Sequence, residues 1–267
     1  MSAPRAGRIA LAADASGIDA LLRHVPRERI ACVVAASRRP QYLEGLRAIA
    51  HDLGVALLVQ PRRGDAPFAE FRREFLALRP DLLVCNSYSM IFPREILDAV
   101  GGNAVNVHFA LLPQNRGPNP LQWCLIHGQA QTGVTLHFMA EGADDGDIIA
   151  QRPIAISDED TWVTLGGRCD AEIAPLLAAA LPAVLASEAP RAAQDARRAT
   201  VNPRLTPESP RIDWALMSDR QVFNLIRAQV APLKGAYFEL SGRRIVFDRY
   251  VPLAGIPLLR TQYASGK

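Results

Sequence analysis

The chain has 267 residues, which is enough for one large domain, or for one domain with a smaller appendage. Apolar residues make up 49% and charged residues 21%, which excludes an intrinsically disordered chain. The 30 Lys and Arg residues nearly balance the 27 Asp and Glu residues, and a net charge of +3 gives no support to nucleic-acid binding.

Neither a membrane span nor an export signal is apparent in the sequence. No apolar run reaches about 18 residues, and the first apolar run is short and interrupted at Asp14. The four cysteines, Cys32, Cys85, Cys124 and Cys169, form no CxxC pair, so reduced thiols are expected. We therefore expect a soluble, cytoplasmic protein that does not associate with membranes.

Short apolar runs alternate with longer amphipathic stretches in the first hundred residues, a pattern typical of βαβ units on a parallel sheet. The expected strands are 8–12, 30–35, 55–60 and 82–85, and the expected helices are 18–23, 41–53 and 67–78. The predicted fold class is α/β, with a doubly wound, mostly parallel sheet. The first βα turn, AADASG at 12–17, lacks the GxGxxG pattern for a dinucleotide pyrophosphate, which argues against NAD.

The middle of the chain departs from this regular alternation. A short helix at 93–99 and a strand at 104–107 precede a segment, 108–120, with three prolines and no periodicity, so an irregular loop is expected there. The following pattern predicts a helix at 121–127 and then two strands, 133–139 and 148–156, joined by an acidic turn.

The last third of the chain predicts a long helical region at 161–186, followed by a polar, Arg-rich and Pro-containing stretch. We divide the chain into a core at 1–186, a surface linker at 187–210 and a small α+β appendage at 211–267. The appendage would contain a helix at 219–228 and a hairpin at 235–247. A free hairpin edge could pair between subunits, which favours a homodimer.

Asn106 and His108 are the first candidates for chemistry. They are two residues apart at the end of a predicted strand, so both side chains face the same side of the sheet. The acidic turn supplies Asp144, Asp145 and Asp147, and one of these carboxylates could orient the imidazole. The spacing alone also fits a purely structural hydrogen-bonded pair.

Other chemistries find less support in the sequence. No HxxxH, HExxH or His/Cys cluster with metal-ligand spacing occurs, so we expect no metal. A GxSxG nucleophile motif is missing. Surface or helix-end roles are expected for His24, His51 and His127, while His137 in a predicted strand stays ambiguous.

Three blocks of sequence follow one another in the middle of the chain: NVHFALLPQNRGPNP from Asn106, GVTLHFM from Gly133 and EGADDGDIIAQ from Glu141. Together they resemble the folate-dependent formyltransferase family, which includes methionyl-tRNA formyltransferases and sugar N-formyltransferases. They match the family pattern of N-x-H, then LLP and RG, then GVT and D-x-G-D. Ala110 departs from the serine that is usual before LLP. The segment NSYSMIFPREIL from Asn86 and the stretch from Arg211-Ile-Asp-Trp through PLKGAYFEL extend the resemblance, which is weakest before residue 80.

The resemblance implies N10-formyltetrahydrofolate as the formyl donor, an amine as the acceptor, and Asn106, His108 and Asp144 as the catalytic residues. Asp147 would instead hold the turn. The resemblance also implies folate-binding residues in three segments, namely Ser89, Met90 and Ile91, then Leu112 and Pro113, then Glu141 and Asp144.

The exact residues of these motifs resemble those of formyltransferases that act on nucleotide-linked amino sugars. A nucleotide-linked amino sugar is therefore the leading acceptor. Arg116 and Trp123 are the candidate acceptor-binding residues, since a nucleotide needs a cation and an aromatic ring. A short appendage and a small net charge disfavour tRNA as the acceptor. N-hydroxyornithine as acceptor, a formyltetrahydrofolate hydrolase and a non-catalytic folate-binding module stay open as alternatives.

Overall fold

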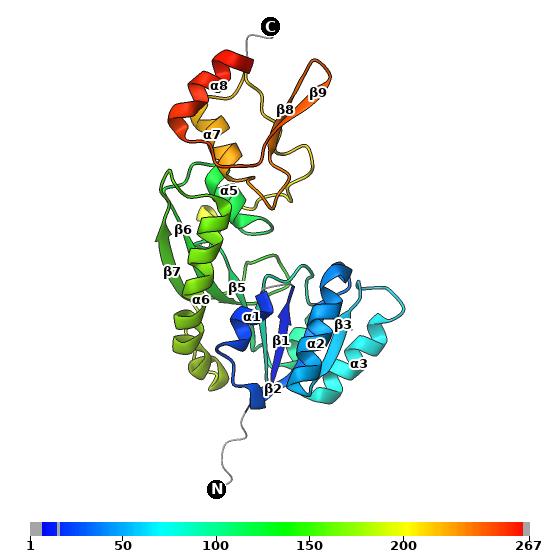
Figure 1. Ribbon diagram of the computed structural model, residues 1–267. Helices are drawn as coiled ribbons and strands as arrows, with labels where there is room; N and C mark the ends of the chain where they lie inside the picture. The colour runs from blue at the N-terminus through cyan, green and yellow to red at the C-terminus, as the bar shows by residue number, and fades with distance from the viewer. Residues whose placement is uncertain (1–6, 15–16, 264–267) are drawn as a thin grey trace. The chain divides into compact units, whose positions relative to one another are not determined.

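The protein is described by a computed structural model, which covers residues 7–14 and 17–263 (Figure 1). Residues 15 and 16 of the first βα turn lie outside the described part. The chain divides into two compact units, each built from three segments. The first unit comprises the residues up to His108, then Val134–Arg152 and Glu172–Ala196; the second comprises Phe109–Gly133, Pro153–Ala171 and the residues from Arg197 onward.

A seven-stranded sheet with strand order β3-β2-β1-β4-β5-β6-β7 carries the first unit. The first five strands are paired in parallel, and β6 is antiparallel to β5. Order reverses between β1 and β4, which makes their carboxyl ends the crossover point where α/β folds bind ligands. The strands are β1 (Ile9–Ala13), β2 (Ile30–Ala36), β3 (Ala56–Gln60), β4 (Leu82–Asn86), β5 (Ala104–His108), β6 (Gln131–Phe138) and β7 (Ile148–Ala155).

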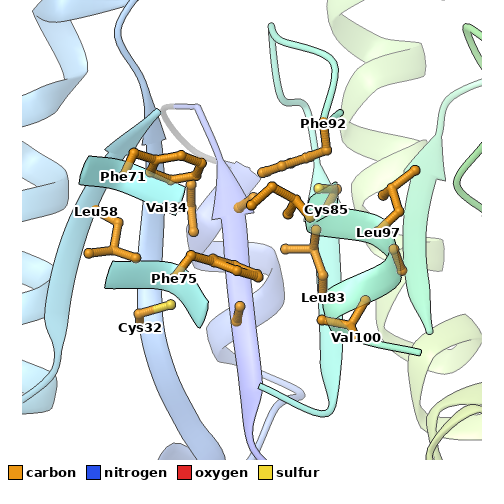
Figure 2. Close-up of a cluster of buried hydrophobic side chains, with 14 residues drawn as sticks. Cys32, Val34, Leu58, Phe71, Phe75, Leu83, Cys85, Phe92, Leu97 and Val100 are labelled. Carbon is orange, nitrogen blue, oxygen red and sulfur yellow. The ribbon is translucent and has the colours of Figure 1, made fainter. Parts of the chain in front are cut away.

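The central strands β1, β2 and β4 are buried along their whole length, as expected of parallel strands covered on both faces. Alternate side chains of these strands, such as Cys32, Leu83 and Cys85, form one hydrophobic cluster with Phe71 and Phe75. In Figure 2 the side chain of Phe71 lies beside that of Val34, and the ring of Phe75 lies between Cys32 and Leu83. Burial raises the pKa of the Cys32 thiol to about 12, so this thiol stays protonated and unreactive.

The helices of the first unit alternate with its strands. Helices α3 and α4 cover the face that carries this cluster, and the right-handed crossover rule puts α1 and α2 on the other face. The bounds are α1 (Gly17–Leu22), α2 (Leu43–Leu53), α3 (Phe68–Leu78) and α4 (Arg94–Ala99), and the long α6 (Trp162–Leu185) follows β7. Short 3-10 turns lie at Arg27–Arg29, Pro40–Tyr42, Ala196–Arg198 and Leu253–Gly255.

The second unit has its own hydrophobic core, which forms around Trp214, Phe223 and Phe238. Its elements are α5 (Pro120–Ile126), α7 (Asp219–Arg227), β8 (Ala236–Leu240), β9 (Arg243–Phe247) and α8 (Ile256–Tyr263). Helix α7 begins with a capping box, in which Ser218 and Gln221 each accept a hydrogen bond from the other's backbone N–H.

The predicted fold class is confirmed, including the mostly parallel sheet, the hairpin around the acidic turn and the small α+β unit near the C-terminus. The segment 187–210, which we expect to be a surface linker, makes backbone hydrogen bonds: Ala192 pairs with Ile148, and the N–H of Thr200 donates to the carbonyl of Pro113. The proposed boundaries at 186 and 210 stay a prediction. In the described part of the chain, no helix is both long and apolar enough to cross a membrane.

Candidate active site

The carboxyl end of β5 carries the two residues that the sequence singled out. Asn106 and His108 are two residues apart and therefore lie on one face of the sheet. The antiparallel neighbour β6 places His137 opposite Asn106 and Thr135 opposite His108. Residues directly opposite in an antiparallel pair share a face, so four polar side chains project on the same side of the sheet.

Asp144 joins three of these side chains in a compact group. Its Oδ2 lies 3.5 Å from Nδ1 of His108, and its Oδ1 lies 3.3 Å from Nδ2 of Asn106 and 3.5 Å from Nε2 of His137. A further 3.2 Å separates Nδ2 of Asn106 from Nε2 of His137. We call Asn106, His108, His137 and Asp144 the polar cluster.

The polar cluster is largely shielded from water. The side chains of His137, His108 and Asp144 are 2%, 8% and 16% exposed. Charges and dipoles interact more strongly in such a site than in water, because the effective dielectric constant is lower. The two imidazole rings face the same carboxylate from different sides, edge to face, with ring centres 6.4 Å apart.

The acidic turn reaches the cluster through a tightly folded backbone. Asp144 has a positive φ of 52°, and the amide of Phe138 donates to the carbonyl of Asp147 over 2.8 Å. A side chain at Gly146 would collide with the carbonyl oxygen of Phe138, so only glycine allows the turn to close on β6.

Gln194 fixes this turn from outside. Its Nε2 donates to the carbonyl oxygens of Asp144, over 2.9 Å, and of Gly146, over 2.7 Å. Nearby, the guanidinium of Arg191 lies 3.5 Å from the ring centre of Phe138 and 3.9 Å from a carboxylate oxygen of Asp147. The segment expected to be a linker therefore holds the loop that carries Asp144.

The residues expected to contact folate lie at the carboxyl end of β4, in the loop Ser87–Phe92. Gln60, at the end of β3, donates to the carbonyl of Ile91 over 2.9 Å and accepts from the hydroxyl of Tyr88 over 2.7 Å. The hydroxyl of Ser37 contacts the sulfur of Met90 at 3.9 Å. The Ile91 side chain is 62% exposed, so this loop presents an apolar surface.

Two buried polar groups lie near this loop, the hydroxyl of Ser89 and the carboxyl group of Asp14, and Ser89 is near enough to act as a hydrogen-bond donor to Asp14. Asp14 directly follows β1, and its backbone N–H donates to the carbonyl of Ser87. Burial raises the pKa of Asp14, although a guanidinium, that of Arg39, lies 3.9 Å away. An exposed apolar side chain beside buried polar groups can bind a flat heteroaromatic ring with polar edges.

The remaining predicted residues fall in different places. Glu141 is exposed at the start of the acidic turn. Leu112 is buried and Pro113 accepts a hydrogen bond from Thr200, both in the second unit. The indole of Trp123 donates to the carbonyl of Pro203 over 2.9 Å and stacks on His127, also in the second unit.

Arg116 belongs to the second unit as well. Its backbone forms a short bridge with the chain near Val201, accepting from Asn202 and donating to Thr200. The irregular loop after β5 is thus fastened to residues 200–202.

Sequence reasoning did not identify two residues of the site, His137 and Gln194. The signal for His137 was available, because it alternates with Thr135 in a strand of β-forming residues next to the Asn106 strand. Gln194 had no signal, since it lies in an irregular segment 50 residues from Asp144. No three His, Cys, Asp or Glu side chains within 7–14 and 17–263 gather as metal ligands do.

Solved structures with the same fold include several enzymes of formyl transfer. The chain superposes on a 4-N formyltransferase from Francisella tularensis with a TM-score of 0.72 and 17% identity, covering 93% of this chain and 99% of that one. An N-formyltransferase from Helicobacter canadensis, in complex with folinic acid and dTDP-3-aminofucose, superposes with a TM-score of 0.65 and 15% identity, covering 89% of this chain and 86% of that one. Glycinamide ribonucleotide transformylase 1 from Symbiobacterium toebii superposes with a TM-score of 0.60 and 25% identity, covering 70% of this chain and 93% of that one.

The sequence itself matches a family model over residues 13–181, which is more than half of the chain. The model describes formyl transferases, and its matched region contains β5, the acidic turn and the whole polar cluster. The chain belongs to the formyl transferase family and is an enzyme of formyl transfer.

Proposed function

We propose that this enzyme transfers the formyl group of N10-formyltetrahydrofolate to the primary amine of a small acceptor, a nucleotide-linked amino sugar. The observation that carries the proposal is the polar cluster, in which an amide, an imidazole and a carboxylate meet at the carboxyl end of β5 within 3.3 to 3.5 Å. An amide and an imidazolium can stabilise the oxyanion that forms in acyl transfer, and a carboxylate can orient the imidazole.

His108 and Asn106 would stabilise the negative charge that develops on the formyl oxygen when the amine attacks. Each well-placed donor in a shielded site contributes about 3 to 4 kcal/mol to such stabilisation. Asp144 would favour the imidazolium form of His108 by Coulomb attraction and would hold the ring in place. As the new C–N bond forms, the amine loses a proton to water, or to His108 where that ring is neutral. As the bond from the formyl carbon to N10 of the donor breaks, N10 gains a proton.

Bound N10-formyltetrahydrofolate supplies the reactive formyl carbon. Ser89, Met90 and Ile91 would bind the pterin, because their loop combines the exposed apolar side chain of Ile91 with the buried hydroxyl of Ser89. Leu112, Pro113, Glu141 and Asp144 complete the proposed folate contacts.

The proposal of an amino sugar as acceptor rests on the motif spelling and on the similar solved structures. The enzyme from Francisella tularensis is a 4-N formyltransferase, and the one from Helicobacter canadensis was solved with a dTDP-linked aminofucose. Arg116 and Trp123 stay the proposed acceptor contacts, for the pyrophosphate and the base. A homodimer and a cytoplasmic location also stay predictions.

The test is formyl transfer from N10-formyltetrahydrofolate, followed as release of tetrahydrofolate, with separate acceptors. The panel contains dTDP-linked 3-amino and 4-amino dideoxysugars, N-hydroxyornithine, and water alone. Turnover with one amino sugar supports the proposal. Turnover with N-hydroxyornithine alone would keep the chemistry and replace the acceptor, and equal release without any amine would make the protein a hydrolase.

A further inference from the structure

His137 is a buried polar side chain to which the proposed chemistry gives no task. It is 2% exposed and lies opposite Asn106 in the β5–β6 pair. Its Nε2 lies 3.2 Å from Nδ2 of Asn106 and 3.5 Å from Oδ1 of Asp144. A buried imidazole with polar neighbours on both ring nitrogens is held in one orientation and one protonation pattern.

The backbone decides which nitrogen of this ring carries the proton. Nδ1 of His137 lies 2.7 Å from the carbonyl oxygen of Phe138. A carbonyl oxygen only accepts, so Nδ1 is the protonated nitrogen. In the neutral ring, Nε2 is then an acceptor, which suits a hydrogen bond from the amide of Asn106. The hydrogen-bond network thus assigns this tautomer.

The same network orients the Asn106 amide. Nδ2 of Asn106, Nε2 of His137 and Oδ1 of Asp144 are separated by 3.2, 3.3 and 3.5 Å, which is nearly an equilateral triangle. The two acceptors are therefore about 60° apart as seen from Nδ2, whereas the two N–H bonds of a planar amide diverge by about 120°. One N–H points between both acceptors, as a shared hydrogen bond, and the second N–H points away from them.

We infer that His137 is a positioning residue that acts through Asn106. Together with Asp144 it binds the amide nitrogen rather than the amide oxygen, and it thereby leaves the second N–H of Asn106 to donate to the formyl oxygen. This inference rests on the proposed formyl transfer.

The kinetic test compares His137→Leu, which removes the acceptor, with His137→Gln, whose Oε1 can accept from Asn106. We expect kcat to fall about 10- to 100-fold in His137→Leu with both KM values within about 3-fold, and to stay within about 5-fold of the parent in His137→Gln. The exposed His51→Gln is the control and should leave kcat unchanged. Wild-type kcat in His137→Leu, or an equal loss in both folded variants, would overturn the inference.

A double variant separates positioning from a general structural role. If His137 acts through Asn106, then His137→Leu should cost nothing more in an Asn106→Ala background. Losses that multiply in the double variant would mean that His137 acts independently, and the inference would fail.

The third measurement does not depend on activity. In a 15N-histidine NMR spectrum of the free protein at neutral pH, we expect His137, assigned by its loss in His137→Gln, to be protonated at Nδ1 and unprotonated at Nε2. The opposite tautomer, or an imidazolium, would overturn the inference. If the expected tautomer is found but no acceptor is formylated, the proposed function fails while the hydrogen-bond geometry stands.

Discussion

At the scale of single residues, the polar cluster places chemically different groups around one carboxylate. Asp144 contacts an imidazole through one oxygen and an amide and a second imidazole through the other. Each group restricts the orientation of its neighbours, because the shared carboxylate of Asp144 and the shared N–H of Asn106 leave few alternative hydrogen-bonding arrangements. The residues of this cluster should consequently act as one unit.

We predict that Asn106→Ala, His108→Ala and Asp144→Ala each lower kcat by about 100-fold or more, because each removes a group that stabilises the transition state or holds one that does. Binding of 10-formyltetrahydrofolate, measured by calorimetry, should remain. Single-turnover rates isolate the chemical step. Parent-like rates in any of the three would remove that residue from the mechanism.

At the scale of secondary-structure elements, two hydrogen bonds from Gln194 hold the acidic turn that carries Asp144. The turn itself has a left-handed residue and a glycine against the backbone of β6, so it closes in one conformation. The position of the Asp144 carboxylate, which we propose to be catalytic, thus depends on a side chain 50 positions away in the sequence.

Gln194→Ala should lower kcat by about 10-fold, because the carbonyl groups of Asp144 and Gly146 lose their shared donor and the turn gains freedom. Gln41→Ala, a change at an exposed position outside the site, is the matched control. Steady-state kinetics and the melting temperature of both variants test this. A large loss of stability together with activity would point to a wider structural role.

The start of α6 shows how a buried carboxylate can stabilise an element. Burial alone would raise the pKa of Asp160, but hydrogen bonds from Ser157, Arg168 and Thr164 outweigh burial and lower the pKa. Arg168 binds both carboxylate oxygens, at 3.0 and 3.2 Å. A lowered pKa means that the charged form stabilises the folded state.

Asp160→Asn should therefore destabilise the protein at pH 7 by about 1 to 3 kcal/mol. The contribution of the carboxylate is present above the pKa of the unfolded chain and is lost as pH falls through the lower folded pKa, so the difference between parent and variant should shrink in acid. Urea unfolding at pH 7 and near pH 3 measures it. A difference independent of pH would contradict the assignment. Asp158→Asn, at an exposed position, should change stability by less than about 1 kcal/mol.

At the scale of the whole molecule, the two compact units are interleaved along the chain. Each unit consists of three segments, so neither is a continuous piece of sequence. Each has its own buried aromatic residues, with Phe75 in the first unit and Phe223 in the second, both fully buried. Because the chain passes several times between the two units, we expect them to unfold together.

We predict that Phe75→Ala and Phe223→Ala each destabilise the protein by about 3 to 5 kcal/mol, because each leaves a large cavity. Both should shift the same cooperative transition in chemical denaturation, monitored by far-ultraviolet circular dichroism and by tryptophan fluorescence. Two separate transitions, each moved by one variant alone, would show that the units unfold independently.

Much of the fold could be predicted from the sequence, because the patterns that specify it are local. The apolar runs of β1, β2 and β4 are continuous, as in strands buried on both faces, and the helices between them show the expected spacing. The N-x-H motif and the acidic turn also identified Asn106, His108 and Asp144 as candidates. These features depend on residues close together in the chain, so periodicity and motif reading suffice.

Tertiary structure alone decided how the candidates meet. The register of β5 against β6 brings His137 to Asn106, and the closing of the acidic turn under Gln194 brings Asp144 to both. These contacts join residues 31 to 50 positions apart. The local sequence pattern does not specify strand register or loop closure, because both are set by packing between distant segments. The sequence by itself therefore identified the candidate residues of the site, and the tertiary structure determined how they are arranged.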